Sequence, residues 1–233
     1  MSEPASIYRG YRFPPEIISH AVWLYYRFCL SFRDVEDLLA ERGIIVSYEA
    51  IRLWSRKFGG EYARRLKRRE GRLGDFWYLD EMFVKIQGRQ MYLWRAVDQD
   101  GDVLDILVQS RRDRRAAKRF FRRLLKGQGR GPNRLVTDQL KSYSAAHREM
   151  MPSVPHDTSR WSNNRVEVSH EAVRHRERQM RRFKCPGHAQ RFLSVHGVVG
   201  NLFRVGRQKV RAATYRLLRD RSFGVWRQVT CVC

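Results

Sequence analysis

The first sixty residues carry apolar side chains at helical spacing, interrupted by residues that favour turns. Residues 15–29 place isoleucine, valine, leucine and aromatic side chains at intervals of three and four, which predicts a helix. The stretch S-F-R-D that follows has the form of a capping box and begins a second helix, which a glycine at position 43 ends. A third helix is expected over residues 47–58, ending at the paired glycines 59 and 60. Two helices joined by a short glycine-containing turn are typical of a helix-turn-helix, which we assign to residues 1–60.

The pattern changes after a basic connector, residues 61–74, to runs rich in aromatic and β-branched side chains. Three such runs are separated by the turn sequences Q-G-R and Q-D-G-D. They cover residues 76–86, 91–98 and 103–108. This arrangement predicts an antiparallel meander.

Helical and extended patterns alternate in the rest of the chain. Residues 112–126 predict an amphipathic helix whose inward side chains are Ala116, Ala117, Phe120, Phe121, Leu124 and Leu125. A strand, a short helix, a second short strand and a long helix from Asn163 past Phe183 follow. The order βββαβαβα predicts one mixed-sheet α/β domain over residues 75–205, preceded by the all-α helix-turn-helix domain. Residues 206–233 are expected to form a basic C-terminal tail or helix.

The charge of the chain indicates the class of its partner. Lysine and arginine number 47 against 24 aspartates and glutamates, so the formal net charge is +23. Residues 168–233 alone carry 15 basic and three acidic residues. Arginine far outnumbers lysine, and the guanidinium group suits phosphate recognition. Nucleic acid is therefore the expected partner, and no small-molecule substrate is expected.

A cytosolic location is expected, with no membrane partner. The most apolar run, in the first helix, is interrupted by His20 and Arg27 and is too short to span a bilayer. No signal peptide is recognised. The four cysteines form no CxxC pair and suggest no disulfide framework, which fits a reducing compartment.

Three carboxylates are unusual in this basic chain. Asp80 lies in the middle of the first predicted strand, where aspartate is disfavoured and where alternation places it among apolar side chains. Asp138 ends the strand R-L-V-T-D, and Glu167 lies at the start of the long helix. Strand ends often carry functional groups in open α/β sheets. If the three side chains converge, their oxygens suit Mg²⁺ or Mn²⁺, ions that also engage a substrate phosphate.

Two of these carboxylates also have a simpler interpretation. Asp138 can be a helix cap, and Glu167 can be a first-turn carboxylate that favours the helix dipole. Glu81 is expected to point away from Asp80 and to act as a surface or salt-bridge residue. The combination of three acids with basic surroundings favours the metal site.

Residues 15–205 resemble the bacterial insertion-sequence DDE transposases of the IS-six type. The matching stretches, in one order, are L-S-F-R-D-V-E-D-L-L-A-E-R-G-I, V-S-Y-E-A-I-R-L-W, W-Y-L-D-E, Y-L-W-R-A-V-D-Q-D-G, R-R-D-R-R-A-A, L-V-T-D-Q-L-K-S-Y and N-N-R-V-E-V-S-H. The resemblance implies an RNase H-like fold for the catalytic domain. It also implies that Asp80, Asp138 and Glu167 are the catalytic, metal-binding triad, holding two Mg²⁺ (or Mn²⁺) ions. Twenty-eight residues separate Asp138 from Glu167, fewer than in many members of that family.

The same resemblance implies an activity and its partners. A member of this family binds the terminal inverted repeats of its insertion sequence, cleaves the 3′ ends and joins them to target DNA. Replicative cointegrate formation, self-association into a dimer or higher synaptic complex, and a bacterial cytoplasmic, nucleoid-associated location are implied as well.

Further residues are candidates around the triad and for DNA contact. His170 shares a helical face with Glu167 and matches the histidine that follows the glutamate in that family. Asn163 and Asn164 are expected to cap the long helix, with a supporting or phosphate-contacting role as the alternative. Phosphate or base contacts are expected from Arg52, Arg56, Lys57, Arg174, Arg178 and Arg181.

Two other functions remain open from the residues alone. One is a non-catalytic helix-turn-helix DNA-binding protein derived from a decayed transposase. The other is a stand-alone metal-dependent nuclease.

Overall fold

The computed structural model describes residues 7–69, 73–159, 162–204 and 210–232, without the side chains of residues 164, 165, 167 and 168. The chain divides into two units. One comprises Met1–Arg69 with Val198–Cys233, and the other comprises Glu70–Gly197. Within the described ranges, no helix has both the length and the apolar content that crossing a membrane requires.

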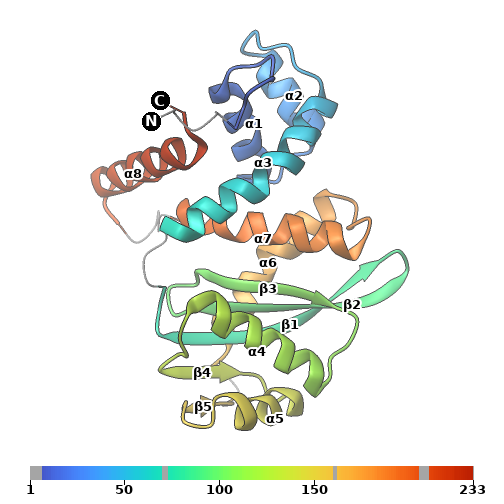
Figure 1. Ribbon diagram of the computed structural model, residues 1–233, viewed down its shortest axis with the longest axis vertical. Helices are drawn as coiled ribbons and strands as arrows, with labels where there is room; N and C mark the ends of the chain where they lie inside the picture. The colour runs from blue at the N-terminus through green and yellow to red at the C-terminus, as the bar shows by residue number, and fades with distance from the viewer. Residues whose placement is uncertain (1–6, 70–72, 160–161, 205–209, 233) are drawn as a thin grey trace. The chain divides into compact units, whose positions relative to one another are not determined.

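The first unit is helical. Its elements are α1 (Pro15–Arg27), α2 (Phe32–Ala40), α3 (Tyr48–Arg69) and α8 (Ala212–Thr230) (Figure 1). The predicted capping box at the start of α2 is confirmed, because the Ser31 hydroxyl accepts a hydrogen bond from the Asp34 amide at 3.1 Å and Asp34 Oδ2 accepts from the Ser31 amide at 2.7 Å. Gly43 has a φ of 73° just after α2, as expected of a glycine that ends a helix. The local signals for helix starts and stops are therefore correct here.

The prediction that the third helix ends at the paired glycines is wrong, because α3 continues to Arg69. Gly59 instead allows close packing within the helical unit. A Cβ atom at Gly59 would lie 2.6 Å from the ring of Tyr26 in α1. The Tyr26 hydroxyl also donates to the Ser55 carbonyl oxygen at 3.1 Å. The glycine thus serves the contact between α1 and α3 instead of ending the helix.

The C-terminal residues form α8, which is part of the helical unit. The Tyr8 hydroxyl donates to the carbonyl oxygen of Thr230 at 2.6 Å and lies 2.6 Å from the Tyr62 hydroxyl. Trp226 of α8 is buried, and its ring lies 5.4 Å from that of Tyr62. These contacts connect the two ends of the described chain through α3.

The second unit contains a five-stranded sheet in the order β3-β2-β1-β4-β5. Its strands are β1 (Phe76–Ile86), β2 (Arg89–Asp98), β3 (Val103–Gln109), β4 (Arg134–Thr137) and β5 (His156–Asp157). The first three strands pair antiparallel, which confirms the predicted meander. Strand β4 pairs parallel with β1, and β5 pairs parallel with β4.

Two helices, α4 (Arg114–Gln128) and α5 (Lys141–Met150), cover one face of this sheet, and α4 is drawn in front of it in Figure 1. Asp113 begins α4 by accepting a hydrogen bond from the Ala116 amide at 2.8 Å. Five of the six side chains predicted to face inward are buried, and Leu125 is partly buried. They pack on a core formed by Trp77, Leu79, Trp94, Ala96, Leu104, Leu135 and Tyr143.

The opposite face of the sheet is contacted by α6 (Asn164–Gln179), and α7 (Pro186–Leu202) follows it. The prediction of one helix running past Phe183 is wrong. The chain reverses at Arg181 and Arg182, whose φ values are 49° and 70°, and the Arg182 amide donates to the Glu177 carbonyl oxygen at 2.9 Å. Two successive left-handed residues cannot continue a helix, so apolar periodicity alone overestimated its length.

Candidate active site

The parallel pairing of β1 with β4 places Asp80 beside Asp138. Leu79 pairs with Thr137 in that register, so the next residue of each strand is one of the two aspartates. One ligand oxygen from each of Asp80, Glu81 and Asp138 lies within 4.8 Å of the other two. The structure therefore brings together two of the three acids that the sequence singled out, and adds a third that it assigned to another role.

Asp80 has a polar partner on the face of the sheet that α6 contacts. Its side chain is 17% exposed, and its Oδ2 lies 3.0 Å from Nε2 of His170 in α6. These two atoms lie within hydrogen-bonding distance of each other. This contact helps to hold α6 on the sheet, as do two further hydrogen bonds among the described residues.

The other two contacts come from Asn163 and Ser169. Asn163 donates from Nδ2 to the carbonyl oxygen of Leu79 at 2.9 Å, and Arg95 donates from Nε to the hydroxyl of Ser169 at 2.8 Å. Arg95 lies opposite Asp80 in the β1–β2 register. Helix α6 is thus attached on both sides of the position of Glu167.

The expectation that Asn163 caps the helix through its side chain is wrong. Asn163 occupies the N-cap position but makes no side-chain capping bond, because its amide group bonds to β1 instead. The side chain of Asn164 lies outside the described residues. The asparagine at position 163 therefore connects the helix to the strand that carries Asp80.

Glu167 belongs to the first turn of α6, and its side chain lies outside the described residues. Its backbone position precedes His170 by three residues, which places both on one helical face. Its predicted role as the third carboxylate stays a prediction.

Glu81 is not a surface residue, which corrects one of the two roles expected for it. Its side chain is only 2% exposed, and it forms an ion pair with Nε of Arg112. Burial, together with the negative charges of Asp138 and Asp80, raises the pKa of Glu81 to about 7, although Arg112 opposes the shift. The expected salt bridge is present.

Asp138 has its own local hydrogen bond. Its Oδ1 accepts from the backbone amide of Leu140 at 3.0 Å, in the turn that leads to α5. Burial raises the pKa of Asp138, and the charge of Asp80 adds to that effect, although the Leu140 amide lowers it. Asp138 therefore both forms a local hydrogen bond in a turn and belongs to the acidic cluster.

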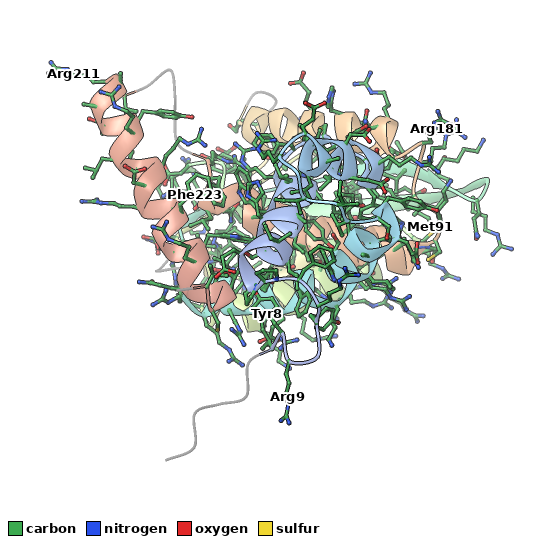
Figure 2. The ribbon with its side chains drawn as sticks, turned by 90° about the horizontal axis from the view of Figure 1, so that it is seen from above. Tyr8, Arg9, Met91, Arg181, Arg211 and Phe223 are labelled. Atoms are coloured by element: carbon green, nitrogen blue, oxygen red, sulfur yellow. The ribbon has the colours of Figure 1, made fainter. Side chains whose placement is uncertain are left out.

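A basic groove of about 1110 Å³ lies between the β1–β2 hairpin and the end of α6. The candidates Arg174, Arg178 and Arg181 line it together with Lys85. In Figure 2 the labelled Arg181 lies on the same side as the labelled Met91 of the hairpin, with long side chains extending outward around them. Three arginines that the sequence assigned to DNA contact therefore share one groove.

The three candidates of α3 have different surroundings within the helical unit. Arg52 forms an ion pair with Glu49 at 2.5 Å, and Arg56 is exposed. Nζ of Lys57 lies 4.7 Å from the ring centroid of Tyr11. Arg52 and Arg56 share one face of α3, because they are four residues apart.

Sequence reasoning missed Arg112, which is part of the site. It precedes α4 in the stretch R-R-D-R-R, where five consecutive charged residues look like a solvated helix start. Its signal was the pair Asp80-Glu81, since two adjacent acids in a buried strand require a cation nearby. The same pair of adjacent acids also indicated that Glu81 has a cationic partner.

Comparison with known proteins assigns the chain to a family. The family described as "DDE domain" matches residues 74–206. A transposase for insertion sequence-like element IS431mec of Staphylococcus aureus is 31% identical over 175 residues, which cover 73% of this chain and 78% of the relative. The transposase for insertion sequence element IS257 in transposon Tn4003 of Staphylococcus aureus has the same identity and coverage.

Among solved structures, the HTLV-2 integrase catalytic core domain in complex with magnesium (dimeric form) has a TM-score of 0.43 and 14% identity, covering 59% of this chain and 91% of that one. The simian T-cell lymphotropic virus intasome in complex with PP2A regulatory subunit B56 gamma has a TM-score of 0.42 and 15% identity, covering 55% and 49%. The DDE-domain match and the five-stranded mixed sheet confirm the predicted RNase H-like fold class. The chain belongs to the insertion-sequence DDE transposases of the IS-six type, which are polynucleotidyl transferases acting in DNA transposition.

Proposed function

We propose that this chain binds the terminal inverted repeats of an insertion sequence, cleaves their 3′ ends and transfers them to target DNA, forming cointegrates. Asp80, Asp138 and Glu167 are its catalytic residues in this proposal. The observation that carries it is the placement of Asp80 and Asp138 on neighbouring parallel strands, with ligand oxygens within 4.8 Å.

The donor set fits two Mg²⁺ or Mn²⁺ ions. The clustered ligand atoms are all carboxylate oxygens, which these ions prefer. Such an ion pair supplies activation of the attacking oxygen and stabilisation of the leaving oxygen in a phosphoryl displacement. Glu167 is proposed as the third ligand because α6 is attached to β1 at Asn163 and at His170, on either side of it.

The protein residues hold this geometry in defined ways. His170 fixes one oxygen of Asp80 by its hydrogen bond and leaves the other for a ligand. The Leu140 amide does the same for Asp138. Because the two aspartates repel each other at this distance, positive charge is required to keep both ionised.

DNA contact is proposed at two places, one in each unit. Residues 47–58 of α3 form the reading helix, where Arg52, Arg56 and Lys57 reach the terminal repeat. Arg174, Arg178 and Arg181 in the basic groove bind phosphates near the carboxylates. Transfer of two ends requires at least two active sites, so a dimer or higher assembly in the bacterial cytoplasm is part of the proposal.

Substitution of the triad tests this function. We expect Asp80→Ala, Asp138→Ala and Glu167→Gln to bind terminal-repeat duplexes like the wild type but to lose Mg²⁺-dependent cleavage and joining. Asp100→Asn is the matched control, because Asp100 is an exposed carboxylate in the β2–β3 turn. If any triad variant still joins ends, the mechanism is wrong.

The same assay separates the two rival functions. Binding to terminal-repeat DNA without cleavage in either metal would identify a non-catalytic DNA-binding protein. Cutting without joining, and without preference for the terminal sequence, would identify a stand-alone nuclease.

A further inference from the structure

Arg112 contacts the acidic cluster on the side of α4. It follows β3 and precedes α4 in the chain, and its Nε contacts Oε1 of Glu81. Its Nη2 lies 3.8 Å from Oδ2 of Asp138. One guanidinium group therefore reaches two of the clustered carboxylates.

The two ion pairs of Arg112 differ in strength. The contact with Glu81 is a direct hydrogen bond, whereas 3.8 Å to Asp138 exceeds hydrogen-bonding distance. Glu81 is buried, while the Arg112 side chain is 35% exposed. Glu81 thus holds the guanidinium group, and cations bound by Asp80 and Asp138 would not remove its anchor.

Within the described part of the chain, the donors of Arg112 other than Nε form no hydrogen bond, and they lie at the edge of the cluster. A guanidinium group has five N–H donors in a planar fork, and Glu81 engages the one on Nε. The guanidinium carbon lies 5.8 Å from the ring centroid of Phe83, a residue that is 47% exposed. Contact with that ring and with Glu81 restricts the orientation of the fork.

We propose that Arg112 binds a phosphate group of the DNA strand next to the scissile position, and that Glu81 is the positioning residue that aims it. This inference rests on the proposed function. A phosphate entering near three carboxylates is repelled by them, and Arg112 supplies an attractive group with the geometry that a phosphate accepts. Divalent ions held by the carboxylates do not replace this contact, because it lies at the edge of the cluster.

The residues around Arg112 also indicate a path for the DNA strand. Phe83 contacts Arg112 and also lines the basic groove, together with Lys85 and Arg178. In this proposal, the DNA strand therefore passes from the carboxylates along Arg112 and Phe83 into the groove between the hairpin and α6.

The test compares Arg112→Ala, Arg112→Lys and Glu81→Gln with Arg111→Ala. Arg111 is the matched control, because it is the neighbouring arginine, is 76% exposed and pairs only weakly with Asp113 at 3.9 Å. Affinity for a terminal-repeat duplex is measured in Ca²⁺ over a series of salt concentrations. Turnover is then measured in Mg²⁺ with the full-length protein.

Arg112→Ala is expected to lower the slope of log affinity against log salt by about 0.9, the contribution of one phosphate contact, whereas Arg111→Ala leaves it unchanged. Arg112→Lys should restore the slope but not the turnover, because lysine lacks the planar fork. Glu81→Gln should keep the slope and lower kcat about tenfold by misdirecting the guanidinium group.

An Arg112→Ala variant with the wild-type salt slope and tighter Mg²⁺ binding would overturn the proposal, because Arg112 would then only neutralise the carboxylates. Circular dichroism and thermal denaturation identify any variant that fails to fold. If Arg112→Ala does not fold, the salt slope and the turnover of Arg112→Lys test the proposal instead. Failure of the proposed function appears separately, as a wild-type protein that cleaves with neither metal.

Discussion

The two faces of β1 place adjacent carboxylates in opposite environments. Asp80 lies on the α6 face, where His170 contacts it and where Arg95, its partner in the β1–β2 register, donates to Ser169. Glu81 lies on the face that α4 and α5 cover, next to an apolar core. On that face burial raises the pKa of Glu81 to about 7. Surroundings, more than residue type, therefore separate a candidate metal ligand from an anchor for an arginine.

The largest difference should appear when each carboxylate becomes an amide. Asp80→Asn is expected to reduce strand transfer on the order of 10³-fold, because it removes a charge from the proposed ligand set. Glu81→Gln is expected to reduce it only about tenfold, because its partner is Arg112. Single-turnover joining assays measure both. Equal losses in the two variants would show that Glu81 is itself a ligand.

Loss of a core side chain on the apolar face of the sheet should lower the free energy of unfolding. Phe120→Ala removes a fully buried ring of α4 and is expected to lower the free energy of unfolding by about 3–5 kcal/mol. Phe76→Ala, at an exposed position of β1, is the control and should cost less than about 1 kcal/mol. Urea denaturation measures both, and similar losses would contradict the assignment of the core.

The side of the sheet that α5 covers also holds a histidine that favours its neutral form. Burial, together with the neighbouring His147, lowers the pKa of His156 to about 4. A histidine whose folded pKa lies below its unfolded value of about 6.5 stabilises the fold above that pH and loses this contribution as the pH falls toward 4.

We therefore expect the wild type to lose about 1–2 kcal/mol of stability between pH 7.5 and pH 5 through this residue. His156→Gln should lose correspondingly less over the same range, because glutamine does not titrate. The difference in urea midpoints of the two proteins at the two pH values measures the effect. A parallel loss in both proteins would assign the pH dependence to other groups.

The smallest effect is expected on the polar face. Ser169→Ala removes the hydroxyl that accepts from Arg95, and should cost about 1 kcal/mol of stability. Strand transfer should fall by about tenfold, because α6 carries the proposed third ligand. Ser169→Thr keeps the hydroxyl and should restore most of both. An alanine variant with full activity would show that the other two contacts position α6 sufficiently.

The order of strands and helices was predictable because it depends on local patterns. The turn sequences Q-G-R and Q-D-G-D separate β1, β2 and β3 as expected, and α4 buries the side chains that its periodicity selected. Predictions were wrong where a distant contact changed the local preference. Gly59 continues a helix because it packs on Tyr26, and Asn163 bonds to β1 instead of capping α6.

The candidate site shows the same division. Asp80 and Asp138 were identifiable because an acid in or at the end of an apolar strand is costly without a function. The pair Asp80-Glu81 indicated a nearby cation but did not identify Arg112, because an arginine among four other charged residues resembles an ordinary exposed charge. Its partner Glu81 lies 31 residues away along the chain.

The amino-acid sequence by itself determined the types of elements, their order and the family. These depend on periodicity, turn residues and motifs, which are formed by residues close together in the chain. Only the tertiary structure decided which side chains meet: that Glu81 is buried, that Arg112 reaches it, and that arginines of α6 and of the turn after it share a groove with the hairpin. The physical reason is that burial and ion pairing depend on distances between segments, which strand register and helix packing set and which no local pattern records.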